Sequence, residues 1–146
     1  MKSATALFCF LFAINLIPLF CQTAKLCTRE DAIQAESEAS SLTNWADVDR
    51  SYGRFAQCDD GAMAEGYSNT VAHLLSDDWA SFDQLNSLVA RHAAFGRFVL
   101  HHIDELMSPN QAGKIRNNAN NHCPAHARHL CKAITVRLKE AAVPPA

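Results

Sequence analysis

The chain has 146 residues, which is enough for one domain and not for two. Its formal net charge at pH 7 is −2, and we expect no nucleic acid among its partners. It contains no internal repeat, low-complexity tract or linker that would divide it, so a multidomain organisation is excluded and a repeat array is disfavoured.

The first 24 residues resemble a signal peptide. Lys2 supplies a positive charge, and residues 4–20 are almost wholly apolar. This run is short for a membrane span, which needs ~20 apolar residues. We therefore expect cleavage between Cys21 and Ala24 and a secreted or periplasmic protein of residues 25–146, with no stable membrane insertion. An uncleaved membrane anchor is the alternative interpretation.

The mature region follows the 3.6-residue period of amphipathic helices, and it contains no convincing strand pattern. Thr28 is placed to cap a first helix over residues 29–41, with Asp31 as its capping-box partner. Asn44 is placed to cap a second helix. The apolar face of that second helix consists of Trp45, Val48, Tyr52 and Phe55.

Three further helices are predicted in the middle of the chain. Asp59 or Asp60 can cap the third, which has a long apolar stripe. The stripe residues of the third helix are Met63, Tyr67, Val71, Leu74 and Leu75. Those of the fourth are Trp79, Phe82, Leu85, Leu88 and Val89, and those of the fifth are Phe95, Phe98, Val99, His102 and Leu106.

Two helices complete the prediction. Ser108 followed by Pro109 is a favourable start for a sixth helix, which ends in the asparagine-rich residues 117–121. A seventh starts at Pro124, and residues 141–146 form a frayed tail. The sequence thus predicts an all-α fold, a compact bundle of about six or seven short helices with two disulfides. A short α-solenoid is the alternative.

Four cysteines remain after the leader, and an even number in an exported chain indicates two disulfides. They are Cys27, Cys58, Cys123 and Cys131. If one helix runs from Pro124, the last two cysteines are ~12 Å apart along it, too far for a bridge. We therefore favour pairing each of them with one of the first two. The alternative pairs the first two together and the last two together, and requires residues 124–130 to form a loop.

The charges are distributed unevenly. Residues 25–105 contain 6 Lys and Arg against 14 Asp and Glu, whereas residues 106–146 contain 6 Lys and Arg against Glu140 alone. We favour the interpretation that the basic C-terminal third packs on the acidic body. The alternative is a basic face that binds an anionic partner.

Three groups of residues are candidate sites. The first is an acidic binding surface that includes Asp59, Asp60 and Glu65, with a partly exposed Trp79 as an anchor. Helix capping explains the two aspartates without any function.

The second group is His122, His126 and His129, whose spacing places them along one face of the seventh helix. Imidazoles in this arrangement suit Zn²⁺, Cu²⁺ or Ni²⁺, but a solvated polar face explains the histidines equally simply. The third candidate is His102, which could serve a nucleophile together with an acidic residue, or lie bonded within the core.

These observations lead to three functional hypotheses. We favour an exported, non-enzymatic module without a cofactor that binds another protein, such as an inhibitor or an immunity-type protein. The second is a periplasmic or extracellular carrier of a metal or small ligand that uses His122, His126 and His129. The third is a small hydrolase that uses His102.

Overall fold

The computed structural model describes residues 25–39 and 41–142, and in these residues the fold is all-α. Seven α-helices are present there, as the sequence predicts, together with three short 3-10 helices, and there is no β-strand. The predicted signal peptide, residues 1–24, lies outside the described residues, as do residues 143–146 of the predicted tail. The α-helices are α1 (Arg29–Ala39), α2 (Trp45–Phe55), α3 (Gly61–Asp77), α4 (Phe82–Arg91), α5 (Ala93–His101), α6 (Pro109–Asn121) and α7 (Arg128–Ala141); the 3-10 helices are η1 (Ala56–Cys58), η2 (Trp79–Ser81) and η3 (Ala125–Ala127).

Four of the helices start where capping side chains predict. The side chain of each capping residue accepts a hydrogen bond from a backbone N–H in the first turn, which satisfies a donor that the helix itself leaves unpaired. Ser108 and Gln111 complete a reciprocal capping box at α6. The capping residues are Thr28, Asn44, Asp60 and Ser108.

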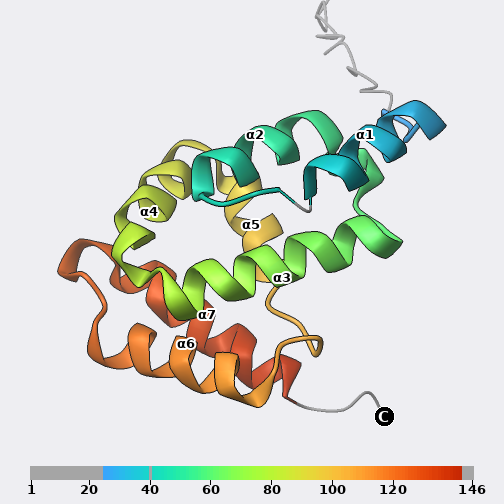
Figure 1. The fold of residues 1–146 in the computed structure, drawn as a ribbon. Coiled ribbons are helices and arrows are strands. Elements are labelled where there is room, and N and C mark those ends of the chain that lie inside the picture. The colour runs from blue at the N-terminus through green and yellow to red at the C-terminus, as the bar shows by residue number, and fades with distance from the viewer. Residues whose placement is uncertain (1–24, 40, 143–146) are drawn as a thin grey trace, which may run out of the picture.

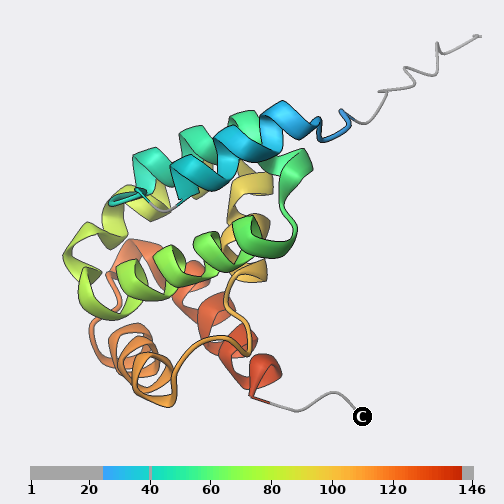
Figure 2. The ribbon, with the colours of Figure 1, turned by 45° about the vertical axis from the view of Figure 1, so that its right-hand side comes forward.

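Helix α3 lies at the centre of the molecule. It runs between a layer formed by α1 and α2 and a layer formed by α6 and α7, and α4 and α5 close the remaining sides (Figure 1, Figure 2). Its predicted apolar stripe is buried throughout, and Tyr67, Val71 and Leu75 are fully inaccessible to solvent. Burial on this scale is the main driving force for the fold, at roughly 1.5–3 kcal/mol for each large apolar side chain.

Helix α1 packs on α3 through small residues. Its buried positions are Ala35 and Ala39, and a Cβ added at Gly66 of α3 would lie 2.9 Å from the Ala39 Cβ. The absence of a side chain at Gly66 therefore allows the two helices to approach closely.

One predicted apolar position is wrong. Leu106 is 58 % exposed, because α5 ends at His101 and the following turns take residue 106 off the helix face. His102, which caps the end of α5, keeps its predicted buried place and is 1 % exposed.

The disulfides form by the pairing that we did not favour. Cys27 pairs with Cys58, and Cys123 pairs with Cys131 across a Cα–Cα distance of 6.2 Å. The favoured prediction fails because the seventh helix does not begin at Pro124. Pro124 is extended, η3 follows it, and α7 starts only at Arg128, so the backbone turns between the two cysteines. A continuous helix would have kept them apart.

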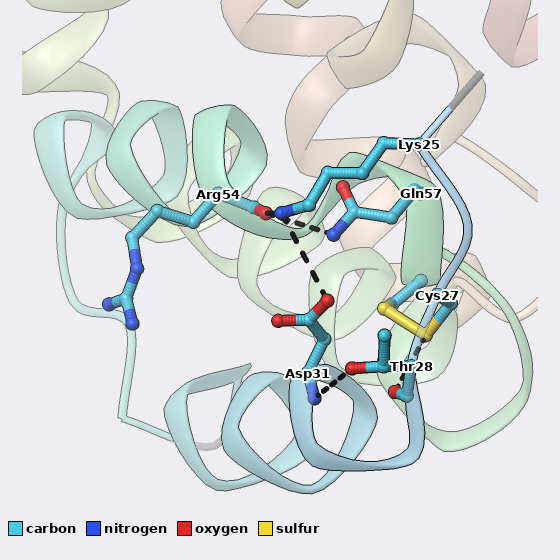
Figure 3. Close-up of a disulfide and its surroundings, with 7 residues drawn as sticks. Lys25, Cys27, Thr28, Asp31, Arg54 and Gln57 are labelled. Carbon is cyan, nitrogen blue, oxygen red and sulfur yellow. Dashed lines mark hydrogen bonds and ion pairs between the residues drawn. A yellow bond between two sulfur atoms is a disulfide. The ribbon is translucent and has the colours of Figure 1, made fainter. Parts of the chain in front are cut away.

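The first disulfide fastens the N-terminal segment to Cys58 of η1, the 3-10 helix that follows α2 (Figure 3). Beside it, Lys25 Nζ donates a hydrogen bond to the Arg54 carbonyl oxygen at 3.3 Å and lies 4.0 Å from the Asp31 carboxylate. The segment before α1 is therefore held by a covalent bond and by polar contacts.

Among the described residues, none of the helices combines the length and the apolar character that crossing a bilayer requires.

Candidate functional site

The predicted acidic surface is not one site. Asp60 is exposed and caps α3, whereas Asp59 beside it is half-buried and faces the interior. Glu65 is exposed one turn further along α3. Trp79 follows the far end of this 17-residue helix, about 25 Å away, where it stacks on Phe82 with ring centroids 4.1 Å apart. The structure therefore does not bring Trp79 together with the three carboxylates.

The three histidines of the predicted metal site lie on three different elements. His122 caps the end of α6, His126 is in η3 and His129 is in α7, so the prediction of one shared helix face is wrong. His126 Nε2 instead lies 3.1 Å from a carboxylate oxygen of Asp83. Among the described residues, no group of three or more His, Cys, Asp or Glu side chains is arranged to hold a metal ion.

His102 is the centre of a buried polar cluster, which consists of Asp59, Ser68, His102 and Asp104. His102 Nδ1 lies 3.0 Å from Ser68 Oγ, and Nε2 lies 3.2 Å from Asp59 Oδ2. Ser68 Oγ in turn donates a hydrogen bond to Asp104 Oδ2 at 2.5 Å. The four side chains come from the segment before α3, from α3 itself, and from the end of α5 and the turn after it.

Ser68 and Asp59 contact the two different nitrogens of the His102 ring. The Ser68 hydroxyl has one proton and donates it to Asp104, which leaves its oxygen to accept a hydrogen bond from Nδ1 of His102. The other ring nitrogen, Nε2, contacts the Asp59 carboxylate. The other oxygen of Asp59, Oδ1, is buried without a hydrogen-bond partner in the described chain. The contact with His102 is therefore important for satisfying the Asp59 carboxylate.

Aromatic rings close this cluster on its inner side. Tyr67 and Phe98 lie against the His102 ring, with centroid distances of 5.4 and 4.4 Å. Burial raises the pKa of the Tyr67 hydroxyl; its hydrogen bond with Ser51 lowers the pKa, and the nearby Asp59 charge raises it again.

A serine, a histidine and an aspartate in contact resemble the parts of a hydrolase site, but this arrangement is closed to a substrate. Ser68 is 4 % exposed, and it lies within a helix rather than on a strained turn. Its proton is committed to Asp104 and not to the histidine, which would have to act as the base. These contacts count against the hydrolase hypothesis.

In the basic C-terminal third, only one of the Lys and Arg residues forms an ion pair with the acidic body. Of these six cations, Lys114 forms an ion pair with Asp77 of α3, and Arg137 pairs with Glu140 of its own helix. The other four have no ion-pair partner in the described chain. Our favoured interpretation of internal neutralisation therefore holds for Lys114 alone, and most of the basic charge faces solvent.

An open groove of about 590 Å³ runs between α5 and α7, and some of these basic residues line it. Helix α5 contributes Arg97, Leu100 and His101, and α7 contributes His129, Lys132, Ala133, Val136, Arg137 and Glu140. Cationic and apolar side chains thus line the same groove, and Val136 is 46 % exposed within it.

The predicted sites did not include this groove, although two sequence signals pointed toward it. The excess of basic residues after residue 106 indicated a positive face, and α7 places His129, Lys132, Val136 and Glu140 at helical spacing. The contribution of α5 depends on how the two helices pack, which no local pattern encodes.

Comparison with models of known protein families, with the curated proteins and with the solved structures finds no match for this chain.

Proposed function

We propose that this protein is an exported, non-enzymatic module that binds another protein through the groove between α5 and α7. The observation that carries the proposal is the combination of accessible apolar side chains with cationic ones in the lining of one open groove. Aliphatic groups that remain accessible in a concave surface gain free energy when a partner covers them, at roughly 25 cal/mol per Å² of apolar area buried. An inhibitor or immunity-type role is the form of binding that we favour.

Two further observations support the proposal. Both disulfides belong to an oxidising compartment, which agrees with export. In the His102 cluster, the serine and the histidine that a hydrolase would use are 4 % and 1 % exposed, so neither side chain is open to a substrate.

A matched pair of variants tests the proposal. Val136→Asp places a charge in the groove, and Leu106→Asp introduces the same charge at an exposed aliphatic position outside it. The wild-type protein is used to capture its partner from the extracellular fraction of the producing cells. The captured partner is identified and purified, and its binding to each variant is measured by titration calorimetry.

We expect wild-type protein and Leu106→Asp to bind the purified partner equally, and Val136→Asp to bind it about tenfold more weakly or worse, a loss of about 1.4 kcal/mol. Urea unfolding of both variants shows whether the fold is retained. A partner that binds folded Val136→Asp as tightly as wild type would overturn the assignment of the groove.

A further inference from the structure

We infer that the groove between α5 and α7 receives an acidic segment of the partner protein, anchored by an aliphatic side chain. This inference rests on the proposed function and adds the chemistry of the occupant.

The first argument is the state of the cations. Arg97 and Lys132 are exposed and, within the described part of the chain, form no hydrogen bond or ion pair. By contrast, Arg50, Arg54 and Lys114 are each paired with a carboxylate of this chain. A partner's carboxylates can therefore reach Arg97 and Lys132 without breaking an existing contact. Among the described residues that line the groove, Glu140 alone is acidic.

The second argument is that Arg137 is already positioned. Its Nε donates a hydrogen bond to the Leu100 carbonyl oxygen at 3.2 Å, and its Nη1 lies 3.6 Å from Glu140. These contacts span the two helices and hold the guanidinium in place, while the side chain stays 30 % exposed. A fixed guanidinium loses less rotamer entropy when it binds a carboxylate than a free one does.

The third argument is the shape and chemistry of the groove between these charges. Leu100, Ala133 and Val136 are partly exposed there and offer contact to an aliphatic anchor. On α7 the groove extends from His129 to Glu140, a rise of about 16 Å. This length matches about three turns of a helix or about five residues of an extended segment.

The charge of the rest of the molecule favours a short acidic segment over a long polyanion. Residues 25–105 contain 14 Asp and Glu against 6 Lys and Arg, so a nucleic acid or an anionic membrane that extended beyond the groove would meet repulsion. A peptide with a few carboxylates around one aliphatic residue is attracted by the groove alone.

The test uses a synthetic peptide in which Leu is flanked by Glu and Asp, and a second peptide with Gln and Asn in their place. Binding to the full disulfide-bonded protein is measured by fluorescence anisotropy at two salt concentrations. Lys132→Glu is compared with Lys139→Glu, which makes the same charge change on the same helix outside the groove.

We expect the acidic peptide to bind wild type and Lys139→Glu within about twofold of each other, and Lys132→Glu about tenfold more weakly or worse. Added salt should weaken binding of the acidic peptide, because ions screen exposed charges. Equal binding of the neutral peptide, equal effects of the two substitutions, or no binding of the acidic peptide would overturn the inference.

Other occupants give distinct results. Tighter binding of single-stranded DNA or of phosphatidylglycerol vesicles than of the peptide would overturn the inference, as would a dimer of this chain that Lys132→Glu dissociates. If the captured partner is sensitive to Val136→Asp but not to Lys132→Glu, the proposed function stands and the acidic segment does not. If it is insensitive to both, the proposed function itself fails.

Discussion

His101 and His102 are consecutive in the chain, yet they belong to two contrasting regions. The His101 ring is exposed and lines the groove, whereas the His102 ring is 1 % exposed and lies in the cluster with Asp59, Ser68 and Asp104. The two rings contact each other edge to face, with centroids 5.3 Å apart. The boundary between groove and core therefore passes between two neighbouring residues.

The two regions put polar groups to different uses. In the cluster the side chains form hydrogen bonds with one another, and Ser68 and His102 are buried, so these contacts contribute mainly to stability. In the groove Arg97 and Lys132 face water, so they contribute little to stability and remain free to bind. Substitutions in the cluster should therefore lower the free energy of unfolding, and those in the groove should lower affinity.

The sharpest test replaces each histidine by alanine. His102→Ala leaves the half-buried Asp59 carboxylate without its hydrogen-bond donor, and we expect a loss of about 3–5 kcal/mol in the free energy of unfolding. His101→Ala removes an exposed ring and should change that free energy by about 0.5 kcal/mol or less. Urea denaturation followed by circular dichroism measures both. Similar losses in the two variants would contradict the distinction between the regions.

The disulfides extend the comparison, since the first ends one residue before Asp59 and the second ends in α7 beside the groove. They close segments with sequence separations of 31 and 8. Chain entropy then predicts that replacing Cys27 and Cys58 by serine costs about 4 kcal/mol, and replacing Cys123 and Cys131 about 2.5 kcal/mol. Thermal unfolding of both double variants gives the order, and the reverse order would contradict the prediction from loop length.

The helices were predictable because their signals are local. The caps at Asn44, Asp60 and Ser108 and the stripe on α3 need only residues within a few turns of one another. The disulfide pairing was not, because it depended on whether residues 124–127 continue the helix backwards from Arg128. A proline in the first turn suits a helix start, but here it precedes a 3-10 turn instead.

The cluster and the groove were predictable only in part. The sequence placed His102 on an apolar face, and that burial is confirmed. Its partners Ser68 and Asp59 are 34 and 43 residues away, and no spacing pattern joins residues so distant. His122, His126 and His129 show the converse. They are close in sequence, but the turn between α6 and α7 places them on three different elements.

A smaller effect is expected at Tyr67, which connects the cluster to α2 through Ser51. Burial raises the Tyr67 pKa above 10.0, so its stabilising contribution is fully present below pH 10 and is lost as the pH rises through the folded-state pKa. Ultraviolet absorbance of the phenolate, measured in a Tyr52→Phe background, follows Tyr67 alone. Ser51→Ala should raise the pKa further, because the hydrogen bond that lowers it is lost. An unshifted Tyr67 would indicate that water reaches this edge of the cluster.

The smallest effect concerns Asp77 and Lys114, a surface pair that belongs to neither region and so shows what an exposed ion pair contributes by itself. The hydrogen bond from Lys114, followed by that from Ser76, lowers the Asp77 pKa from 3.8 to about 2. A lowered pKa stabilises the fold above pH 3.8, and this contribution is lost as the pH falls toward 2.

Lys114→Ala should raise the Asp77 pKa toward 3.8, as followed by NMR of the carboxyl carbon, while the unfolding midpoint at pH 7 stays nearly unchanged because both side chains are exposed. The matched control is Lys139→Ala, which removes a cation that has no ion-pair partner in the described chain. It should leave the Asp77 pKa unchanged. A marked loss of stability in Lys114→Ala would mean that surface pairs between α3 and α6 stabilise the fold as the buried cluster does. Burial would then no longer explain why the cluster contributes more to the free energy of unfolding than exposed ion pairs do.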